Sequence, residues 1–151
     1  MKILMICLGN ICRSPLAEGI LRQKANASNL DWQIDSCGTG GWHAGEKPDI
    51  RSIEVAQKNG IDISKQLARK LRCTDIDNFD ILYVMDKQNY EDVVRNCHTE
   101  EEKQRVKLIL SEVEAWEDAE VPDPYFGEKD GFDKVFAMLD KACDAIIEKY
   151  K

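Results

Sequence analysis

The fold of this chain is decided by residues 2–16, which read KILMICLGNICRSPL. The apolar run at residues 3–7 is short and rich in isoleucine, which favours a buried strand. Gly9 and Asn10 interrupt the run. Ser14 followed by Pro15 is typical of a helix N-cap and the first helical position. This stretch therefore predicts a strand, a tight loop and a helix.

The rest of the chain repeats this alternation. Apolar runs predict further strands at residues 32–37, 80–85 and 106–110. Apolar spacing predicts helices that begin near Ile50 and after Asp86, and a longer one at residues 132–147. We expect Asn59-Gly60 to close the first of these helices. Strands that alternate with helices predict an α/β fold with a parallel sheet covered on both faces.

Ligands of such sheets bind beyond the carboxyl ends of the strands. Three features fall there, namely residues 7–14, the Gly-rich stretch that follows Cys37, and Asp86. We expect the functional site at this edge. Asp86 itself is expected chiefly as a helix N-cap, with a support of the first loop as the alternative.

Length and charge limit the classes of function. The 151 residues fit one domain over 1–151, and a net charge of −7 argues against nucleic-acid or membrane partners. No stretch reaches the ~18 apolar residues of a membrane span, and the N-terminus lacks the features of a signal peptide. We therefore expect a cytoplasmic protein and a monomer.

The cysteine pattern favours free thiols over a disulfide framework or a metal site. No two of the six cysteines have CxxC spacing. His43 and His98 have no ligand partners at metal-binding spacing and are expected on the surface. We expect no metal and no cofactor. The six cysteines are Cys7, Cys12, Cys37, Cys73, Cys97 and Cys143.

Residues 7–14 carry the groups that a phosphate cradle needs. A loop that leads into a helix N-terminus can aim several backbone N–H groups at one oxyanion. Arg13 can hold two of its oxygens. Gly9 is expected to allow a strained turn, and Asn10 tolerates a positive φ.

The same environment favours the thiolate of Cys7, since a helix N-terminus and an arginine stabilise the negative charge. We expect Cys7 to attack phosphorus in line, with the Ser14 hydroxyl stabilising the thiolate. The alternative is an inert buried thiol at the end of a strand.

The expected proton donor is Asp123, which stands between Pro122 and Pro124. Two restricted φ angles can fix a carboxyl group above a pocket, although taken by itself such a segment is more typical of a surface turn. Tyr125-Phe126 is expected to form one wall of a substrate slot and Trp42 the opposing wall, with Trp42 as a loop anchor packed on the core as the alternative.

Four segments resemble the low-molecular-weight protein tyrosine phosphatases. They read, in order, CLGNICRSPLAEG, DSCGTGGWHAGEKPD, FDILYVMD and VPDPYFG, and the resemblance runs from Lys2 to Ile147. It implies a single-domain, four-stranded parallel sheet with helices on both faces and a phosphate-binding loop between the first strand and first helix. It also implies a cysteinyl-phosphate intermediate without a metal, and a tyrosine-phosphorylated protein as substrate.

The resemblance also assigns roles. It makes Cys7 the nucleophile, Arg13 the phosphate-binding arginine and Asp123 the general acid. Cys12 becomes the redox partner of Cys7, and Ser36 supports the loop through Asn10. The expected substrate-binding residues are Leu8, Gly9, Asn10, Ile11, Cys12, Ser14, Trp42 and Tyr125.

The chain departs from the family pattern at three positions. Gln66 stands where many members have a histidine that contacts the loop asparagine, and it is expected to keep that hydrogen bond without the charge. Cys37 stands where alanine is common, and Phe126 replaces a second tyrosine.

Two other functions compete. An arsenate reductase of related fold shares the CxxxxxRS loop but needs a closely spaced pair of shuttle cysteines, whereas Cys73 and Cys97 lie far apart in sequence. A non-catalytic phosphotyrosine-binding or redox-sensing module would not need Cys7, Arg13 and Asp123 together.

Overall fold

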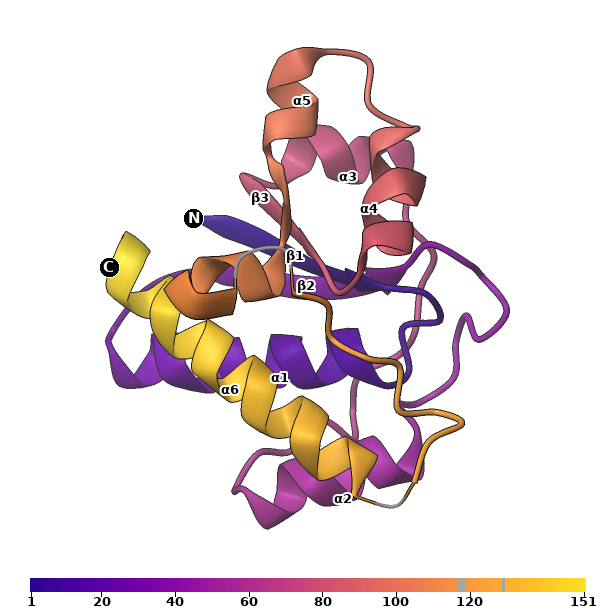
Figure 1. Ribbon diagram of the computed structural model, residues 1–151, viewed down its shortest axis with the longest axis vertical. Helices are drawn as coiled ribbons and strands as arrows, with labels where there is room; N and C mark the ends of the chain where they lie inside the picture. Colours follow the sequence, from indigo (N-terminus) through magenta and orange to yellow (C-terminus); the bar gives the residue numbers. More distant parts are fainter. Residues whose placement is uncertain (117–118, 129) are drawn as a thin grey trace.

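The sheet is the centre of the molecule (Figure 1). The computed structural model describes residues 1–116, 119–128 and 130–151. In these residues four parallel strands lie in the order β2-β1-β3-β4. Ile3 of β1 pairs with Ile34 on one side and Ile81 on the other, so the loop that follows β1 emerges between two neighbours. The strands are β1 Lys2–Cys7, β2 Gln33–Gly38, β3 Ile81–Val84 and β4 Val106–Leu108.

Helices cover both faces of this sheet, as predicted. One layer holds α1, α2 and α6, and the opposite layer holds α3 and α4, with α5 beyond α4 (Figure 1). Their bounds are α1 Arg13–Ala27, α2 Ile50–Lys58, α3 Cys73–Asn78, α4 Lys87–Val94, α5 Glu100–Gln104 and α6 Gly131–Tyr150.

The core divides along β1 because successive side chains of a strand point to opposite faces. Ile3 and Met5 pack in the cluster that contains α1 and α6, whereas Leu4 and Ile6 pack with residues of α3 and α4. All four side chains are fully buried. This explains why β1 reads as a continuous apolar run.

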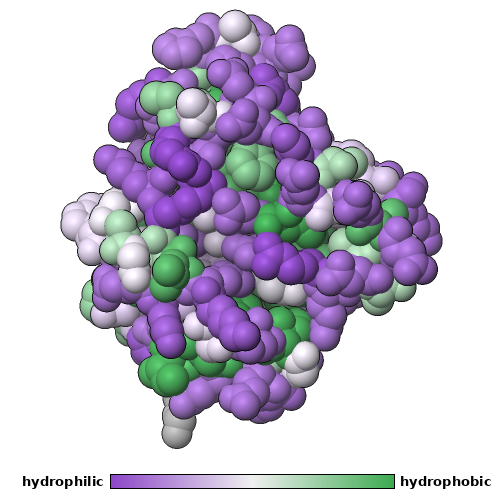
Figure 2. Space-filling model, turned by 180° about the vertical axis from the view of Figure 1, so that it is seen from behind, coloured by the Kyte–Doolittle hydropathy of each residue, from purple (hydrophilic) through white to green (hydrophobic). Residues whose placement is uncertain are grey.

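The outer surface is mostly hydrophilic on the face opposite to that of Figure 1, with apolar atoms in small separate patches (Figure 2). Among the described residues, none of the helices combines the length and apolar character needed to cross a bilayer.

Two local predictions are wrong. The helix α1 begins at Arg13, so Ser14 and Pro15 lie inside its first turn, where a missing proline N–H costs no hydrogen bond. The strand β4 ends at Leu108 because the chain turns into a short 3-10 helix, Ile109–Glu112, whose first two residues are buried. The prediction that Asn59 and Gly60 end α2 is confirmed, with Gly60 at φ +79°.

Candidate active site

The loop between β1 and α1 is held from behind by the side chain of Asn10. Asn10 adopts a φ of 58°, a positive value that asparagine tolerates, and it is almost fully buried. Its amide nitrogen donates to Ser14 Oγ over 2.8 Å and to Ser36 Oγ over 3.0 Å. Its amide oxygen accepts from the backbone N–H of Arg69 over 3.0 Å. Three segments of the chain therefore fix this loop through one side chain.

Cys7 ends β1 at the base of the loop. Its sulfur lies 3.0 Å from Ser14 Oγ, and the residue is 3% exposed. Ser14 makes no N-cap hydrogen bond because its hydroxyl faces the loop interior, toward Cys7 and Asn10. The first amides of α1 are consequently not capped by a side chain, which is the arrangement that an anion site at a helix N-terminus requires.

Arg13 is oriented by partners on two other segments. Its Nη1 donates to Asp86 Oδ2 over 2.7 Å and to the carbonyl oxygen of Val121 over 3.0 Å. Burial opposes its charge, but neighbouring Cys7 and Asp86 raise the pKa of Arg13 above its ordinary value. Asp86 also caps α4 by accepting from Asn89 N over 2.8 Å. It is therefore both a helix N-cap and a support of the loop after β1, the two roles that the sequence suggested.

Asp123 lines the same pocket as Cys7 and Arg13. One of its carboxylate oxygens is 3.8 Å from Arg13 Nη2, and the other accepts from the Tyr125 backbone N–H over 3.0 Å. The carboxyl group remains 44% exposed. The aromatic rings of Tyr125 and Phe126 meet edge to face, with centroids 4.7 Å apart. Asp123 is thus positioned by its own loop and faces the pocket.

A pocket of about 300 Å³ brings most of the predicted residues together. Asn10, Ser14 and Ser36 do not line it and instead support the loop from behind. This agrees with their expected role in holding the loop, and the assignment of Asn10 and Ser14 as substrate-binding residues stays a prediction. The lining residues are Cys7, Leu8, Gly9, Ile11, Cys12, Arg13, Trp42, His43, Asp123, Tyr125 and Phe126.

Gly9 and His43 differ from expectation. Gly9 does not adopt a positive φ, so its role is not a strained turn. A Cβ at this position would lie 3.1 Å from His43 Cδ2, because the imidazole packs over the loop. His43 is bonded to Glu46 through Nδ1 at 2.7 Å and borders the pocket rather than being a plain surface residue.

Gln66 does not replace the family histidine. Its amide nitrogen donates to the carbonyl oxygen of Pro15 over 3.1 Å, and it makes no hydrogen bond to Asn10. The acceptor side of Asn10 is used by the Arg69 backbone instead. Gln66 therefore supports the first turn of α1 and not the loop asparagine.

Sequence reasoning missed Glu18. This buried carboxylate accepts from Ser36 Oγ over 2.6 Å and pairs with Arg22 at 3.0 Å. It therefore extends the hydrogen-bond chain that runs from Cys7 through Ser14, Asn10 and Ser36. A signal existed, because position 18 is one helical turn beyond Ser14 and shares its face.

Sequence reasoning also missed the pair Asp49 and Arg51 at the start of α2. Asp49 caps that helix, and its two carboxylate oxygens each accept from the Arg51 side chain over 2.9 Å. Arg51 donates further to the carbonyl oxygen of Tyr125 over 3.2 Å and lies 5.3 Å from the centre of its ring. The start of α2 is thereby tied to the loop that carries Asp123.

Cys12 lies in the same pocket as Cys7 but in a different electrostatic setting. Burial, with nearby Asp49, Cys7 and Asp123, raises the pKa of Cys12 to about 12. Cys12 is therefore a neutral thiol at physiological pH. Burial also raises the pKa of Cys37, which lies within β2.

Comparisons with known proteins identify the family of this chain. A model of the family "Low molecular weight phosphotyrosine protein phosphatase" matches residues 2–151. The enzyme of that name from Schizosaccharomyces pombe is 42% identical over 141 residues, covering 91% of this chain and 89% of its own. The human enzyme of that name is 32% identical, covering 98% and 94%.

Solved structures share the fold of this chain. A protein tyrosine phosphatase from Entamoeba histolytica, with Hepes in its active site, superimposes with a TM-score of 0.92 at 35% identity, over 99% of this chain and 96% of that one. A drosophila arginine phosphatase gives 0.92 at 30% identity, over 100% and 98%. These similarities support the phosphatase interpretation over the reductase and non-catalytic alternatives. The chain belongs to the low molecular weight phosphotyrosine protein phosphatase family.

Proposed function

We propose that this protein hydrolyses phosphotyrosine in proteins through a cysteinyl-phosphate on Cys7, without a metal ion. The observation that carries the proposal is the placement of Cys7, Arg13 and Asp123 in one pocket of about 300 Å³. These three groups supply a nucleophile, a cation for the phosphoryl oxygens and a proton donor.

In the first step the phosphate dianion lies on the loop amides and the Arg13 guanidinium. The Cys7 thiolate attacks phosphorus, and the bond from phosphorus to the phenolic oxygen breaks. Asp123 gives its proton to that departing oxygen, so that neutral tyrosine leaves. The uncapped amides of α1 and the buried Arg13 balance the charge that gathers on the phosphoryl group.

In the second step water attacks the phosphorus of the cysteinyl-phosphate. The carboxylate of Asp123 takes a proton from this water, the bond to sulfur breaks, and inorganic phosphate leaves. The Ser14 hydroxyl, 3.0 Å from the sulfur, can donate to the departing thiolate. The enzyme returns to its starting protonation state.

The shape of the pocket favours an aryl phosphate. Leu8, Ile11 and the ring of Trp42 provide apolar walls on which a phenyl ring can pack. A phenol of pKa ~10 is also a better leaving group than a serine alkoxide. One structural relative is described as an arginine phosphatase, so the test of this proposal includes a phosphoarginine peptide.

Three further points belong to this proposal. A catalytic thiol must stay reduced, and the six cysteines are present as thiols, which supports a reducing cytoplasmic location. The nucleophile, arginine and acid all come from one chain, which supports action as a monomer. We place the whole activity in one phosphatase domain over residues 1–151.

The test compares matched peptides that carry phosphotyrosine, phosphoserine or phosphoarginine at one position, in the presence of a chelator. We expect phosphate release from the phosphotyrosine peptide alone, and none from it with Cys7→Ser. Retention of vanadate binding by Cys7→Ser would show that the loop is intact. Equal or faster turnover of the phosphoserine or phosphoarginine peptide would contradict the proposal.

A further inference from the structure

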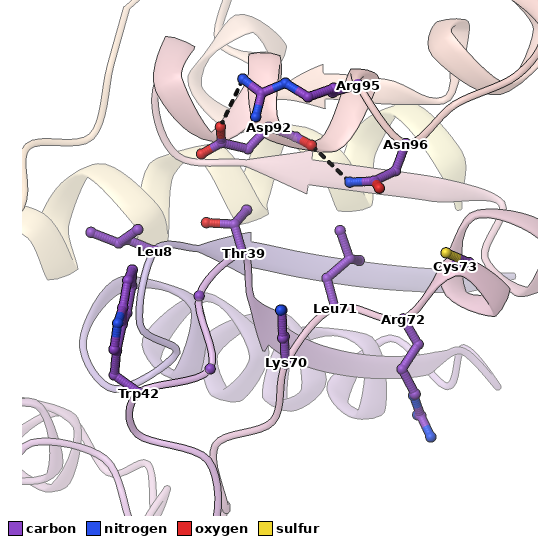
Figure 3. A pocket seen from close by; sticks show the side chains of 12 residues that line it. Leu8, Thr39, Trp42, Lys70, Leu71, Arg72, Cys73, Asp92, Arg95 and Asn96 are labelled. Atoms are coloured by element: carbon purple, nitrogen blue, oxygen red, sulfur yellow. Dashed lines mark hydrogen bonds and ion pairs between the residues drawn. The ribbon is translucent and has the colours of Figure 1, made fainter.

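A second pocket, of about 590 Å³, lies beside the one that contains Cys7 (Figure 3). It is formed by the segment after β2, by residues 70–73 and by the end of α4. The backbones of the first two segments run together, because Gly38 and Lys70 form a β-bridge. The lining residues are Leu8, Thr39, Gly40, Gly41, Trp42, Lys70, Leu71, Arg72, Cys73, Asp92, Arg95 and Asn96.

Leu8 and Trp42 line both pockets, so they form the partition between them. The two side chains lie next to each other at one end of the second pocket (Figure 3). The position of Trp42 depends on Gly40, since a Cβ there would lie 1.9 Å from Trp42 Cζ3. A ligand in the second pocket is therefore adjacent to a ring that packs in the proposed phosphotyrosine slot.

The second pocket is positively charged. Three cations of the described part of the chain, Lys70, Arg72 and Arg95, border it against one carboxylate, Asp92, and the Arg72 guanidinium points away from it. Asp92 is already paired with Arg95 at 3.5 Å. This local excess of positive charge stands out in a chain whose net charge is −7.

Lys70 is the cation best placed to meet a ligand. Its side chain points into the pocket between Thr39 and Leu71, whereas Arg72 extends to the other side of the strand-like segment (Figure 3). The stem of Lys70 lies along Gly41, where a Cβ would be 3.2 Å from Lys70 Cδ. The glycine thus lets the lysine stem lie close to the backbone, and its ammonium group remains at the exposed end.

We propose that this pocket binds an acidic side chain of the substrate next to the phosphotyrosine, with Lys70 pairing with its carboxylate. The inference rests on the proposed function and adds a substrate preference to it. Neighbouring residues of an extended peptide have Cα atoms 3.8 Å apart and alternate sides, so residues beside the phosphotyrosine reach across the Leu8 and Trp42 partition. A substrate carboxylate in this pocket is attracted by the Lys70 ammonium group and by the surrounding positive potential.

The experiment measures kcat/KM on two phosphotyrosine peptides that differ only in flanking residues, glutamates in one and glutamines in the other. The ratio of the two values is taken within each enzyme, so that changes in the catalytic loop cancel. An exposed ion pair predicts a ratio of about 2 to 5 in the wild type, mostly through KM. The ratio should fall as salt is raised, since screening shortens the range of the attraction.

Three variants locate the effect. Lys70→Gln should remove the preference, and Lys70→Arg should keep it. Lys65→Gln removes one exposed lysine near the same segment but outside this pocket, and it should leave the ratio unchanged.

Equal kcat/KM for both peptides in the wild type overturns the subsite while leaving the proposed function in place. A preference that survives Lys70→Gln, or that is lost equally in Lys65→Gln, also overturns it. Failure to hydrolyse either peptide contradicts the proposed function itself, and the subsite with it.

Discussion

The guanidinium of Arg13 donates to the carboxylate of Asp86 over 2.7 Å, which joins the first residue of α1 to the N-cap of α4. The other carboxylate oxygen accepts from Asn89 N over 2.8 Å. One side chain therefore begins a helix and orients the arginine of the phosphate loop. The two helix ends meet because β1 and β3 are neighbouring parallel strands whose carboxyl ends share an edge.

Asp86→Asn separates these two roles. Asparagine is an equally good N-cap, so α4 should form normally. Its single acceptor oxygen cannot serve both Asn89 and Arg13, and the charge-assisted hydrogen bond is lost. We expect kcat/KM on a phosphotyrosine peptide to fall by about 10- to 100-fold, since hydrogen bonds to charged groups contribute about 1.5–3 kcal/mol. Vanadate inhibition should weaken in parallel, and unchanged vanadate affinity would contradict this role.

Asp123→Asn tests the proton donor. Hydrolysis of phenyl phosphate should slow by roughly 10²–10⁴-fold, the usual effect of a positioned general acid. The loss should be smaller for p-nitrophenyl phosphate, whose leaving group needs less protonation. The alkaline limb of the wild-type pH profile should flatten in the variant. An equal loss on both substrates, with that limb intact, would make Asp123 a purely structural residue.

Cys12 is expected to protect Cys7 from irreversible oxidation. A sulfenic acid formed on Cys7 by peroxide can condense with the Cys12 thiol, releasing water and forming a disulfide. Activity should therefore return after dithiothreitol in the wild type and much less in Cys12→Ser. Cys37→Ala is the matched control and should recover like the wild type. Sulfinic acid on Cys7 of the wild type, with no disulfide to Cys12, would count against the idea.

Glu18 links the stability of the fold to pH. Burial raises the pKa of this carboxyl group above its ordinary value, although Ser36 and Arg22 act in the opposite direction. The folded state then holds the proton more tightly than the unfolded chain. The contribution of Glu18 to stability is therefore complete at acidic pH and is lost as pH rises through the folded-state pKa.

The measurement is urea unfolding of the wild type and of Glu18→Gln, which keeps an acceptor for Ser36. The free energy of unfolding of the wild type, relative to the variant, should decrease as pH is raised from about 4 to about 7. A difference that is constant over this range, or that increases, would contradict the assignment.

The local sequence was sufficient to predict a helix, a strand or its end where the residues that determine it lie in one segment. The first strand, loop and helix follow from an apolar run, a break at Gly9 and Asn10, and a polar helix start. Asp86 and the pair Asn59-Gly60 mark helix ends because cap chemistry involves neighbouring residues. The order of the four motifs carried the resemblance to the family, and the comparisons confirm that family.

Long-range contacts determine the features that the sequence did not predict correctly, namely α3 and the roles of Gln66 and Ser14. The short helix α3 has little periodicity, and Asp75 within it is held by Arg69 at 2.9 Å and by Arg72 N at 2.8 Å. Gln66 donates to the carbonyl oxygen of Pro15, and Asn10 accepts from the Arg69 backbone, contacts between residues 51 and 59 positions apart. Ser14 was misassigned as a cap since its hydroxyl is used by Cys7 and Asn10, a choice that depends on the closed loop.

The most direct test of the account is to trap phosphate on the enzyme. Asp123→Asn should still be phosphorylated by p-nitrophenyl phosphate, whose leaving group needs little acid, but should activate water poorly, so that the intermediate accumulates. Rapid quenching followed by peptide mass spectrometry should find one phosphate on the sulfur of Cys7, and none in the same variant with Cys7→Ser. Phosphate on Cys12 or another residue, or turnover by Cys7→Ser, would contradict the central claim that Cys7 is the nucleophile.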